Sequence, residues 1–366
     1  MPLLPTPPCD EYVTLEGIIA SFIEDPSLLD EETFDSLALR VFALQFERNE
    51  VYRRFCEAAG RTSPTSWRDI PALPTEAFKR AEVRSFSPSD TVAMFETSGT
   101  TRGQGGRHYF RSLRLYDAAI VPEFRAYLMG TAHRLPMFIL TPTPAEAPRS
   151  SLVHMMTVVV KHFAMGAPKY YISEGHLRTA ALMADLEECS RAGQPVMLLG
   201  TAFALAAFVE TLGAQNRRLP LPAGSRIMET GGFKGRHREI PRPAFYAMMA
   251  DMFGVPLHHI VNEYGMTELS SQFYDTSLRD GAPTAIKSVP AWSRVVCVDP
   301  ATGREVDRGA RGLIRIVDLA NLGSVIALQT EDVGVRHADG RFEIRGRVAA
   351  APPRGCSLDA EDLGTE

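Results

Sequence analysis

Hydrophobic positions along the chain follow helical and strand periods in turn. In residues 13–60 apolar side chains recur at steps of three and four, which predicts helices, with Asp30 as an N-cap and Gly60 as a stop. Residues 61–90 contain several prolines and are expected to form an irregular connection. The beginning of the chain is therefore predicted to be a helical portion that leads into a different architecture.

Between residues 91 and 268 short apolar runs alternate with longer amphipathic segments. The short runs predict strands within residues 91–96, 135–142, 167–173, 194–201, 225–232 and 257–264. The longer segments predict helices within residues 111–130, 150–166, 176–193, 202–215 and 242–254. Repeated alternation of strand and helix is typical of an α/β fold, a doubly wound and mostly parallel sheet flanked by helices.

After residue 285 the pattern changes to short alternating runs separated by turn residues. These runs lie at residues 291–306, 309–320 and 341–348. They predict a small antiparallel, barrel-like β unit near the C-terminus.

Composition and charge narrow the class of protein. The chain has 366 residues, 45% apolar and 23% charged, as expected of a folded globular protein. Its formal net charge of -5 argues against general nucleic-acid binding. No apolar run reaches membrane-spanning length, and the N-terminus does not resemble a signal peptide, so we expect a cytoplasmic protein without membrane insertion. The five cysteines are widely spaced and form no CxxC pair, which favours free thiols over disulfides or a zinc site.

The stretch from Glu96 to His108 reads ETSGTTRGQGGRH and is rich in glycine, serine and threonine. Glycines let a ligand approach the backbone closely, while amide and hydroxyl groups donate hydrogen bonds to anionic oxygens. Such a loop between a strand and a helix can hold phosphate, although a plain surface loop has the same composition. It lacks the spacing of a Walker motif. The candidate phosphate ligands are Thr97, Ser98, Gly99, Thr100, Thr101 and Gly103, with Arg102 and Arg107 as the nearest cations.

The order TSGTT followed by glycine resembles the phosphate-binding loop of the adenylate-forming superfamily, which includes acyl-CoA synthetases and luciferases. A second segment, NEYGMTE at residues 262–268, is similar to the superfamily's active-site motif. The resemblance implies that Tyr264 borders the adenine with Gly265 beside it, that Thr267 contacts the α-phosphate, and that Glu268 holds Mg²⁺. Carboxylate oxygen suits that cation. By itself, the second segment is also explained by a polar loop with a buried tyrosine.

Three further segments resemble the same superfamily. QTEDVG at residues 329–334 implies that Asp332 holds the ribose hydroxyls, because a carboxylate accepts two hydrogen bonds at once. IRGRV at residues 344–348 implies that Arg347 contacts phosphate or ribose. METGGFKG at residues 228–235 implies that Gly231 and Gly232 leave room for the adenine.

The resemblance covers roughly residues 90–348 and departs from the superfamily at the end of the chain. It implies an adenylate-forming domain over residues 1–345, of which residues 1–90 are the helical portion, and a short tail over residues 346–366. Most members continue into a lid domain that brings a catalytic lysine. Here the last lysine is Lys287, so we expect no separate C-terminal lid domain.

The ending RGRVAAAPPRGCSLDAEDL resembles that of the acyl-protein synthetases of bacterial bioluminescence, which share the short form. This resemblance implies that Cys356 accepts the acyl group as a thioester. A thiolate is a suitable nucleophile toward an acyl adenylate, which carries a good leaving group. Composition alone predicts a flexible terminus with a free cysteine.

The predicted function is that of an ATP-dependent acid–thiol ligase that forms acyl-AMP, with ATP and Mg²⁺ as cofactors. The substrate is expected to be a carboxylic acid, most simply a fatty acid, in an apolar pocket near His154, Gly200 and Thr201. An acyl reductase or a carrier protein is the expected partner. One alternative is a stand-alone adenylating enzyme for an aromatic or small acid, as in phenazine biosynthesis. Another is a nucleotide-binding module without turnover.

Overall fold

The computed structural model describes residues 10–97, 105–232 and 240–348. Its helices are α1 (Glu11–Glu24), α2 (Glu31–Arg48), α3 (Glu50–Ala58), α4 (Ala77–Arg80), α5 (Arg114–Phe124), α6 (Ser151–Phe163), α7 (Thr179–Arg191), α8 (Ala202–Ala214), α9 (Arg242–Phe253) and α10 (Ser277–Asp280). Its strands are β1 (Leu73–Pro74), β2 (Ala93–Glu96), β3 (Arg107–Phe110), β4 (Met137–Leu140), β5 (Lys169–Tyr170), β6 (Ile172–Ser173), β7 (His176–Leu177), β8 (Met197–Thr201), β9 (Arg226–Thr230), β10 (Ile260–Tyr264), β11 (Phe273–Tyr274), β12 (Ser293–Val298), β13 (Arg311–Asp318), β14 (Ala327–Arg336) and β15 (Phe342–Arg347).

A six-stranded sheet forms one half of the molecule, in the order β11-β10-β9-β8-β4-β5. All of its pairings are parallel except that of β10 with β11. Successive side chains face opposite layers: Phe138 and Leu140 pack among helices α7–α9, whereas Met137 and Ile139 pack among α5 and α6. Helices on both faces confirm the predicted doubly wound arrangement.

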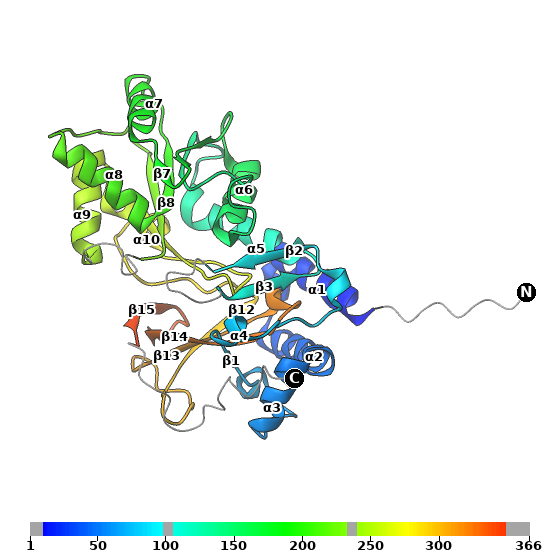
Figure 1. Cartoon of the computed structure of the whole chain (residues 1–366). Coiled ribbons are helices and arrows are strands. Elements are labelled where there is room, and N and C mark those ends of the chain that lie inside the picture. The colour runs from blue at the N-terminus through cyan, green and yellow to red at the C-terminus, as the bar shows by residue number, and fades with distance from the viewer. Residues whose placement is uncertain (1–9, 98–104, 233–239, 349–366) are drawn as a thin grey trace, which may run out of the picture.

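A five-stranded sheet forms the other half, where β12, β13, β14 and β15 pair antiparallel in succession and β1 pairs parallel with β14. It corresponds to the small antiparallel β unit that the sequence predicts. The sequence did not predict β14 or β1 as strands; β1 lies in the region expected to be irregular. The largest apolar cluster lies between this sheet and helices α1–α3. Figure 1 shows the two sheets one above the other, with β2 and β3 near the level where they meet.

The helical portion at the start of the chain is confirmed in detail. The Asp30 side chain accepts a hydrogen bond from the Thr33 amide at 2.8 Å and caps α2, as predicted. Gly60 follows α3 with φ at +64°, a conformation that favours glycine after a helix. Asn49 separates α2 from α3 and caps the second of them.

The glycine-rich stretch lies in a different local setting from the one predicted. It does not lead from a strand into a helix, because β3 follows it and pairs antiparallel with β2 from Glu96↔Arg107 to Ala93↔Phe110. A strand of four residues is too short to give a clear periodicity, so the sequence pattern missed it. The stretch is therefore the loop of a β-hairpin.

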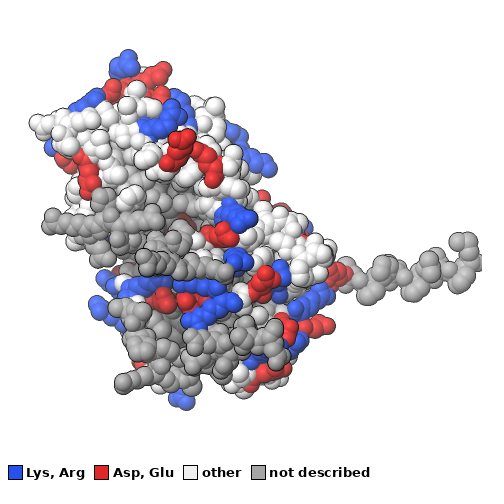
Figure 2. All heavy atoms as spheres, viewed as in Figure 1, with Lys and Arg blue, Asp and Glu red and all other residues white. Residues whose placement is uncertain are grey.

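Charges of both signs are interspersed over the molecular face in Figure 2, around its middle and lower part, whereas its upper part carries large uncharged areas. Many of these charged side chains form ion pairs on the surface, and both partners are often about half exposed, as in Arg347 and Glu331. Pairs of this kind contribute little to stability, typically about 0–1 kcal/mol. Within the described ranges, no helix combines the length and the apolar character needed to cross a bilayer.

Candidate active site

The base of the β2–β3 hairpin is fixed by two hydrogen bonds between Thr97 and Gly106, one from the backbone and one to the side chain of Thr97. Its amide donates to the Gly106 carbonyl at 2.9 Å, and its Oγ1 accepts from the Gly106 amide at 2.8 Å. A side chain at Gly105 would place Cβ only 2.6 Å from the Thr97 carbonyl oxygen, so this position requires glycine. Ser98, Gly99, Thr100, Thr101 and Gly103 lie outside the described residues.

The segment that leaves β10, residues 264–268, carries four of the predicted site residues, and two hydrogen bonds hold its C-terminal end. His108 of β3 donates from Nδ1 to the Thr267 carbonyl at 2.8 Å. Burial lowers the His108 pKa to about 4, so its ring is neutral near pH 7. Asn321 Nδ2 donates to the Glu268 carbonyl at 2.9 Å. The hairpin and the connection between β13 and β14 therefore fix this segment together.

Glu268 lies directly against the base of the hairpin. A Cβ added to Gly106 would stand 3.3 Å from Glu268 Oε1, and Glu268 is only 7% exposed. The Thr267 side chain is likewise buried, with its hydroxyl 3.4 Å from that of Ser151 at the start of α6. The structure thus brings the described ends of the glycine-rich loop to Thr267 and Glu268, about 160 to 170 residues further along the chain.

Tyr264, Asp332 and Arg347 form a second group beside this segment. Tyr264 donates from its hydroxyl to Asp332 Oδ2 at 2.8 Å, and burial raises the pKa of its phenol well above the usual value. Asp332 faces Arg347 across the β14–β15 pair, with Nε 3.9 Å from Oδ1. Arg347 also binds Glu331 at 2.7 Å.

The three predicted adenine-side glycines differ in their surroundings. Gly231 has φ at +77°, and among the described residues beyond the chain neighbours no atom lies within 4 Å of the Cβ position of Gly231 or Gly232. Both are exposed at the end of β9. At Gly265, in contrast, a Cβ would stand 2.4 Å from Glu263 Oε1. No described residue packs against Gly231 or Gly232, whereas the close approach of the Glu263 carboxyl group requires glycine at position 265.

The carboxyl edge of the parallel sheet presents a row of polar residues, the place where ligands bind in folds of this kind. Thr201, Thr230 and Glu263 are in register on β8, β9 and β10. The Thr201 hydroxyl accepts from the Ala204 amide and caps α8. The space beside Gly200 is occupied by Leu140, because a Cβ at residue 200 would stand 2.9 Å from Leu140 Cβ.

His154 and Arg107 already have partners within the fold. His154 Nε2 lies 2.7 Å from Asp117 Oδ1, which joins α6 to α5, and its ring packs against Phe95 of β2. Arg107 begins β3, where its Nε is 3.9 Å from Glu96 Oε1. A hydrogen bond to Tyr109 raises the Arg107 pKa. Arg107 follows Gly106 in the hairpin, whereas His154 touches the hairpin at Phe95.

Several residues that shape the site were missed by sequence reasoning. His108 and Asn321 anchor the 264–268 segment, and Glu263 is buried beneath it. Lys287 is fully buried and donates from Nζ to the Asn262 carbonyl at 2.8 Å, so it has a structural role. The only available signals were a histidine soon after the glycine-rich loop and an acidic residue inside the NEYGMTE motif.

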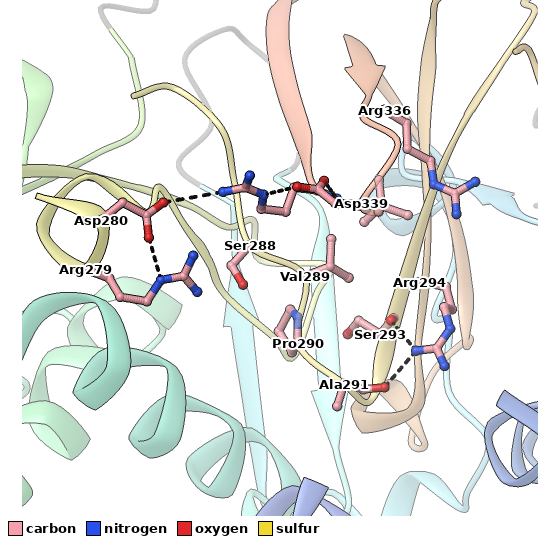
Figure 3. Close-up of a pocket in the computed structure, with 13 residues that line it drawn as sticks. Arg279, Asp280, Ser288, Val289, Pro290, Ala291, Ser293, Arg294, Arg336 and Asp339 are labelled. Atoms are coloured by element: carbon pink, nitrogen blue, oxygen red, sulfur yellow. Dashed lines mark hydrogen bonds and ion pairs between the residues drawn. The ribbon is translucent and has the colours of Figure 1, made fainter. Parts of the chain in front are cut away.

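The cavity in Figure 3, about 720 Å³ in volume, lies apart from these residues. It is lined by arginines that are already paired: Arg279 with Asp280 at 2.8 Å and Arg341 with Asp339 at 2.6 Å. The predicted site residues that the structure describes are absent from its lining. We therefore assign the candidate site to the polar segments around residues 264–268 rather than to this cavity.

Solved structures with a similar fold are enzymes of the adenylate-forming type. A 2-hydroxyisobutyryl-CoA ligase in complex with 2-HIB-AMP is matched with a TM-score of 0.63 and 16% identity, covering 87% of this chain and 68% of that chain. A long-chain-fatty-acid-CoA ligase from Archaeoglobus fulgidus is matched with a TM-score of 0.50 and 17% identity, covering 70% of this chain and 52% of that chain. The chain thus spans only about half to two thirds of these structures. At such identity the likeness shows the fold, and it confirms the predicted fold class.

Two curated relatives are matched over nearly their whole length. A long-chain-fatty-acid–luciferin-component ligase of Vibrio harveyi is 22% identical over 355 residues, covering 93% of this chain and 90% of the relative. The ligase of the same name from Aliivibrio fischeri is 21% identical over 350 residues, covering 91% and 89%. A family model described as acyl-protein synthetase, LuxE, matches residues 24–363. The chain therefore belongs to the acyl-protein synthetase family of the LuxE type.

Proposed function

We propose that this protein activates a fatty acid with ATP and then carries the acyl group on Cys356. In the first step a carboxylate oxygen attacks the α-phosphorus, the bond to the β-phosphate breaks, and pyrophosphate leaves. In the second step the Cys356 thiolate attacks the acyl carbon, the acyl–oxygen bond breaks, and AMP leaves. The names of both curated relatives support a long-chain acid as the substrate. Cys356 lies outside the described residues, so the family resemblance supports its role.

The observation that carries this proposal is the approach of Glu268 to the hairpin that bears the glycine-rich loop. The phosphate-binding role belongs to loop residues Ser98 to Gly103, and Thr97 and Arg107 mark the two described ends of that loop. Glu268 Oε1 lies next to Gly106 at the loop's exit, and Thr267 lies beside it. The described ends of the loop therefore lie beside a carboxylate suited to a cation, which supports a site that stabilises charge on a triphosphate.

The remaining nucleotide contacts follow from the second group of residues. Asp332 would accept hydrogen bonds from the ribose hydroxyls, since its carboxylate has unused lone pairs beyond the one that Tyr264 occupies. Arg347 stands beside it on β15 and would contact phosphate or ribose. Gly231 and Gly232 would leave space for the adenine between the end of β9 and Tyr264.

The residues present suit Mg²⁺ that arrives with the nucleotide. The described residues contain no cluster of three or more acidic, histidine or cysteine ligands. Mg²⁺ commonly takes one or two protein carboxylates and completes its shell with phosphate oxygens and water. Glu268 would be its protein ligand, and the cation would neutralise charge on the phosphates.

The acid would lie along the carboxyl edge of the parallel sheet. Thr201 and Gly200 stand at that edge, and His154 lies one helical turn from Ser151, the neighbour of Thr267. We assign these three residues to the substrate side of the site. A reductase or carrier protein would then receive the acyl group from the Cys356 thioester.

The proposal is tested by acid-dependent exchange of labelled pyrophosphate into ATP, with fatty acids of several lengths and aryl acids. We expect exchange with long-chain acids and its loss in Glu268→Ala. Exchange with aryl acids alone would favour the stand-alone adenylating enzyme, and no exchange with any acid would favour a binding module.

The acceptor is tested separately with a radiolabelled fatty acid and ATP. Wild-type protein should retain the label in a form that hydroxylamine removes, and Cys356→Ser should not. Cys189→Ser is the matched control, because Cys189 is a half-buried cysteine of α7 far from the candidate site in the sequence. Equal labelling of Cys356→Ser and wild type would refute the acceptor role.

A further inference from the structure

The carboxyl group of Glu263 lies beneath the segment that carries Tyr264, Gly265, Thr267 and Glu268. Glu263 is the penultimate residue of β10 and is 4% exposed. Its Oε2 accepts a hydrogen bond from the Thr230 hydroxyl, at the last position of the adjacent strand β9. Gly231 and Gly232 follow Thr230 directly. One side chain therefore joins the two strand ends from which the proposed adenine-side segments begin.

The same carboxyl group also supports the turn above it. Glu263 Oε1 occupies the place where a side chain at residue 265 would begin, 2.4 Å from that Cβ position. Gly265 therefore packs directly onto the carboxyl group, and this contact sets the path of the backbone as it leaves β10. The segment is fixed further on at Thr267 and Glu268 by His108 and Asn321.

We infer that Glu263 is a positioning residue of the nucleotide site, whose buried carboxyl group holds residues 264–268 against the end of β9. This inference rests on the proposed function, since it assigns the held segment to ATP binding. Glu263 would not touch the nucleotide itself. It would act through Gly265 and Tyr264 on one side and through Thr230 and the two glycines on the other.

The charges around Glu263 determine when its carboxyl group is neutral. Burial raises its pKa to about 7, with a further upward contribution from Glu229, while the Thr230 hydroxyl bond and Lys287 act in the opposite direction. The titratable and charged groups that face this region are Tyr116 of α5, Glu229 of β9, Tyr274 of β11, and Lys287; Asp275 and Arg242 lie beyond, against Lys287 and Glu229.

The sign of the pH effect follows from the raised pKa. A carboxyl group with a folded-state pKa near 7 and an ordinary value of 4.5 stabilises the fold fully below pH 4.5 and loses that contribution as pH rises through 7. Above pH 7 the buried carboxylate repels Glu229 and attracts solvent. The hold on residues 264–268 should therefore weaken as pH rises from 6 to 8.5.

The test compares the KM for ATP of four full-length proteins between pH 6 and pH 8.5, in the pyrophosphate exchange assay. In the wild type we expect KM to rise at least fivefold across this range, with kcat changing less than twofold. Glu263→Gln keeps the shape and remains neutral, so its KM should stay flat. Thr230→Val removes the hydrogen-bond donor and should raise KM at every pH.

Glu229→Gln is the matched control, because Glu229 is equally buried on the adjacent strand and also has a raised pKa. Its Oε1 accepts from Tyr246 and Asn262, each at 2.8 Å, away from residues 264–268. It should change the melting temperature and keep the rise of KM with pH, shifted to lower pH, because Glu229 no longer raises the Glu263 pKa. A Glu263→Gln profile that follows the wild type, or a change in melting temperature alone, overturns the inference.

A direct measurement of ATP binding separates this inference from the proposed function. Calorimetric titration of the same proteins with ATP needs no turnover. If the wild type binds ATP but shows no acid-dependent exchange, the proposed reaction fails, and the pH dependence of Kd in Glu263→Gln still decides the role of Glu263. If the wild type does not bind ATP, both are wrong.

Discussion

Replacing Gly265 by alanine is the sharpest single perturbation of the candidate site. The new Cβ would stand 2.4 Å from Glu263 Oε1, whereas ordinary contact begins near 3.4 Å, so about 1 Å of displacement is required. The carboxyl group is buried and bonded to Thr230, so it cannot simply swing into solvent. Either the carboxyl leaves Thr230 or the backbone of the segment shifts.

The expected destabilisation combines two effects. Losing the Thr230 hydrogen bond costs about 0.5–1.5 kcal/mol, and overpacking a well-filled site costs about 1–3 kcal/mol. Gly265→Ala should therefore lower the free energy of unfolding by about 2–4 kcal/mol, measured by urea denaturation followed by circular dichroism. Gly232→Ala is the control, because its Cβ would meet no atom of the other described residues within 4 Å and its stability should remain within about 0.5 kcal/mol of wild type.

A double-mutant cycle identifies the cause of that loss. In Glu263→Ala the space beside residue 265 is empty, so adding Gly265→Ala to that background should cost at least about 1 kcal/mol less than in the wild type. Distant sites without shared partners add to within about 0.3–0.5 kcal/mol. Additive effects of the two changes, or a Gly265→Ala protein as stable as wild type, would refute the packing argument.

Three further predictions concern other parts of the site. Because burial lowers the His108 pKa to about 4 from an ordinary 6.5, stability should fall by up to about 3 kcal/mol as pH drops through that window, and His108→Asn should flatten this dependence in urea titrations. Gly200→Ala should destabilise the protein by about 1–3 kcal/mol, because its Cβ would meet Leu140. Gly213→Ala, in open space on α8, should stabilise it by about 0.5–1 kcal/mol. Melting temperatures of the two variants that shift in the same direction would contradict this. Asp332→Asn should raise the KM for ATP about tenfold. With 2′-deoxy-ATP, which lacks one ribose hydroxyl, the KM values of variant and wild type should differ by a smaller factor if Asp332 holds the ribose.

The parallel half of the fold was predictable from the sequence because its signal is local. Each buried strand is a compact apolar run, and each helix shows its own period, as in residues 135–142 and 150–166. The matched family confirms the resemblance to acyl-protein synthetases and, with it, the predicted class of AMP-forming ligase. The strands that escaped prediction, β1, β3, β7, β11 and β14, are short or bear polar residues. Their pairing depends on partners that the local pattern does not contain.

The β14 strand shows why motif and secondary structure can compete in one stretch. Residues 327–336 include QTEDVG, whose polar residues suggest a loop, and Asp332 was read from it as a ligand-binding position. The structure keeps this stretch as a strand because β13 and β15 pair with it on its two sides. The side chain of Asp332 is presented to Tyr264 by that strand. The motif therefore indicated the candidate ligand-binding role of Asp332, but the local sequence did not indicate the strand pairing that positions its side chain.

The residues that position the site lie beyond the reach of local reasoning for a physical reason. Tyr264, Gly265, Thr267 and Glu268 stand together in the chain, so a motif can mark them. Their anchors are 53 to 159 residues away: Asn321 reaches the Glu268 carbonyl, and His108 reaches the Thr267 carbonyl. Both anchors donate to backbone carbonyls, which every residue possesses, so nothing in the sequence of the segment specifies its partner. Transferring NEYGMTE alone to another scaffold should therefore give a loop without a fixed conformation, whereas adding partners equivalent to His108, Asn321 and the Glu263–Thr230 pair would supply the contacts that hold it.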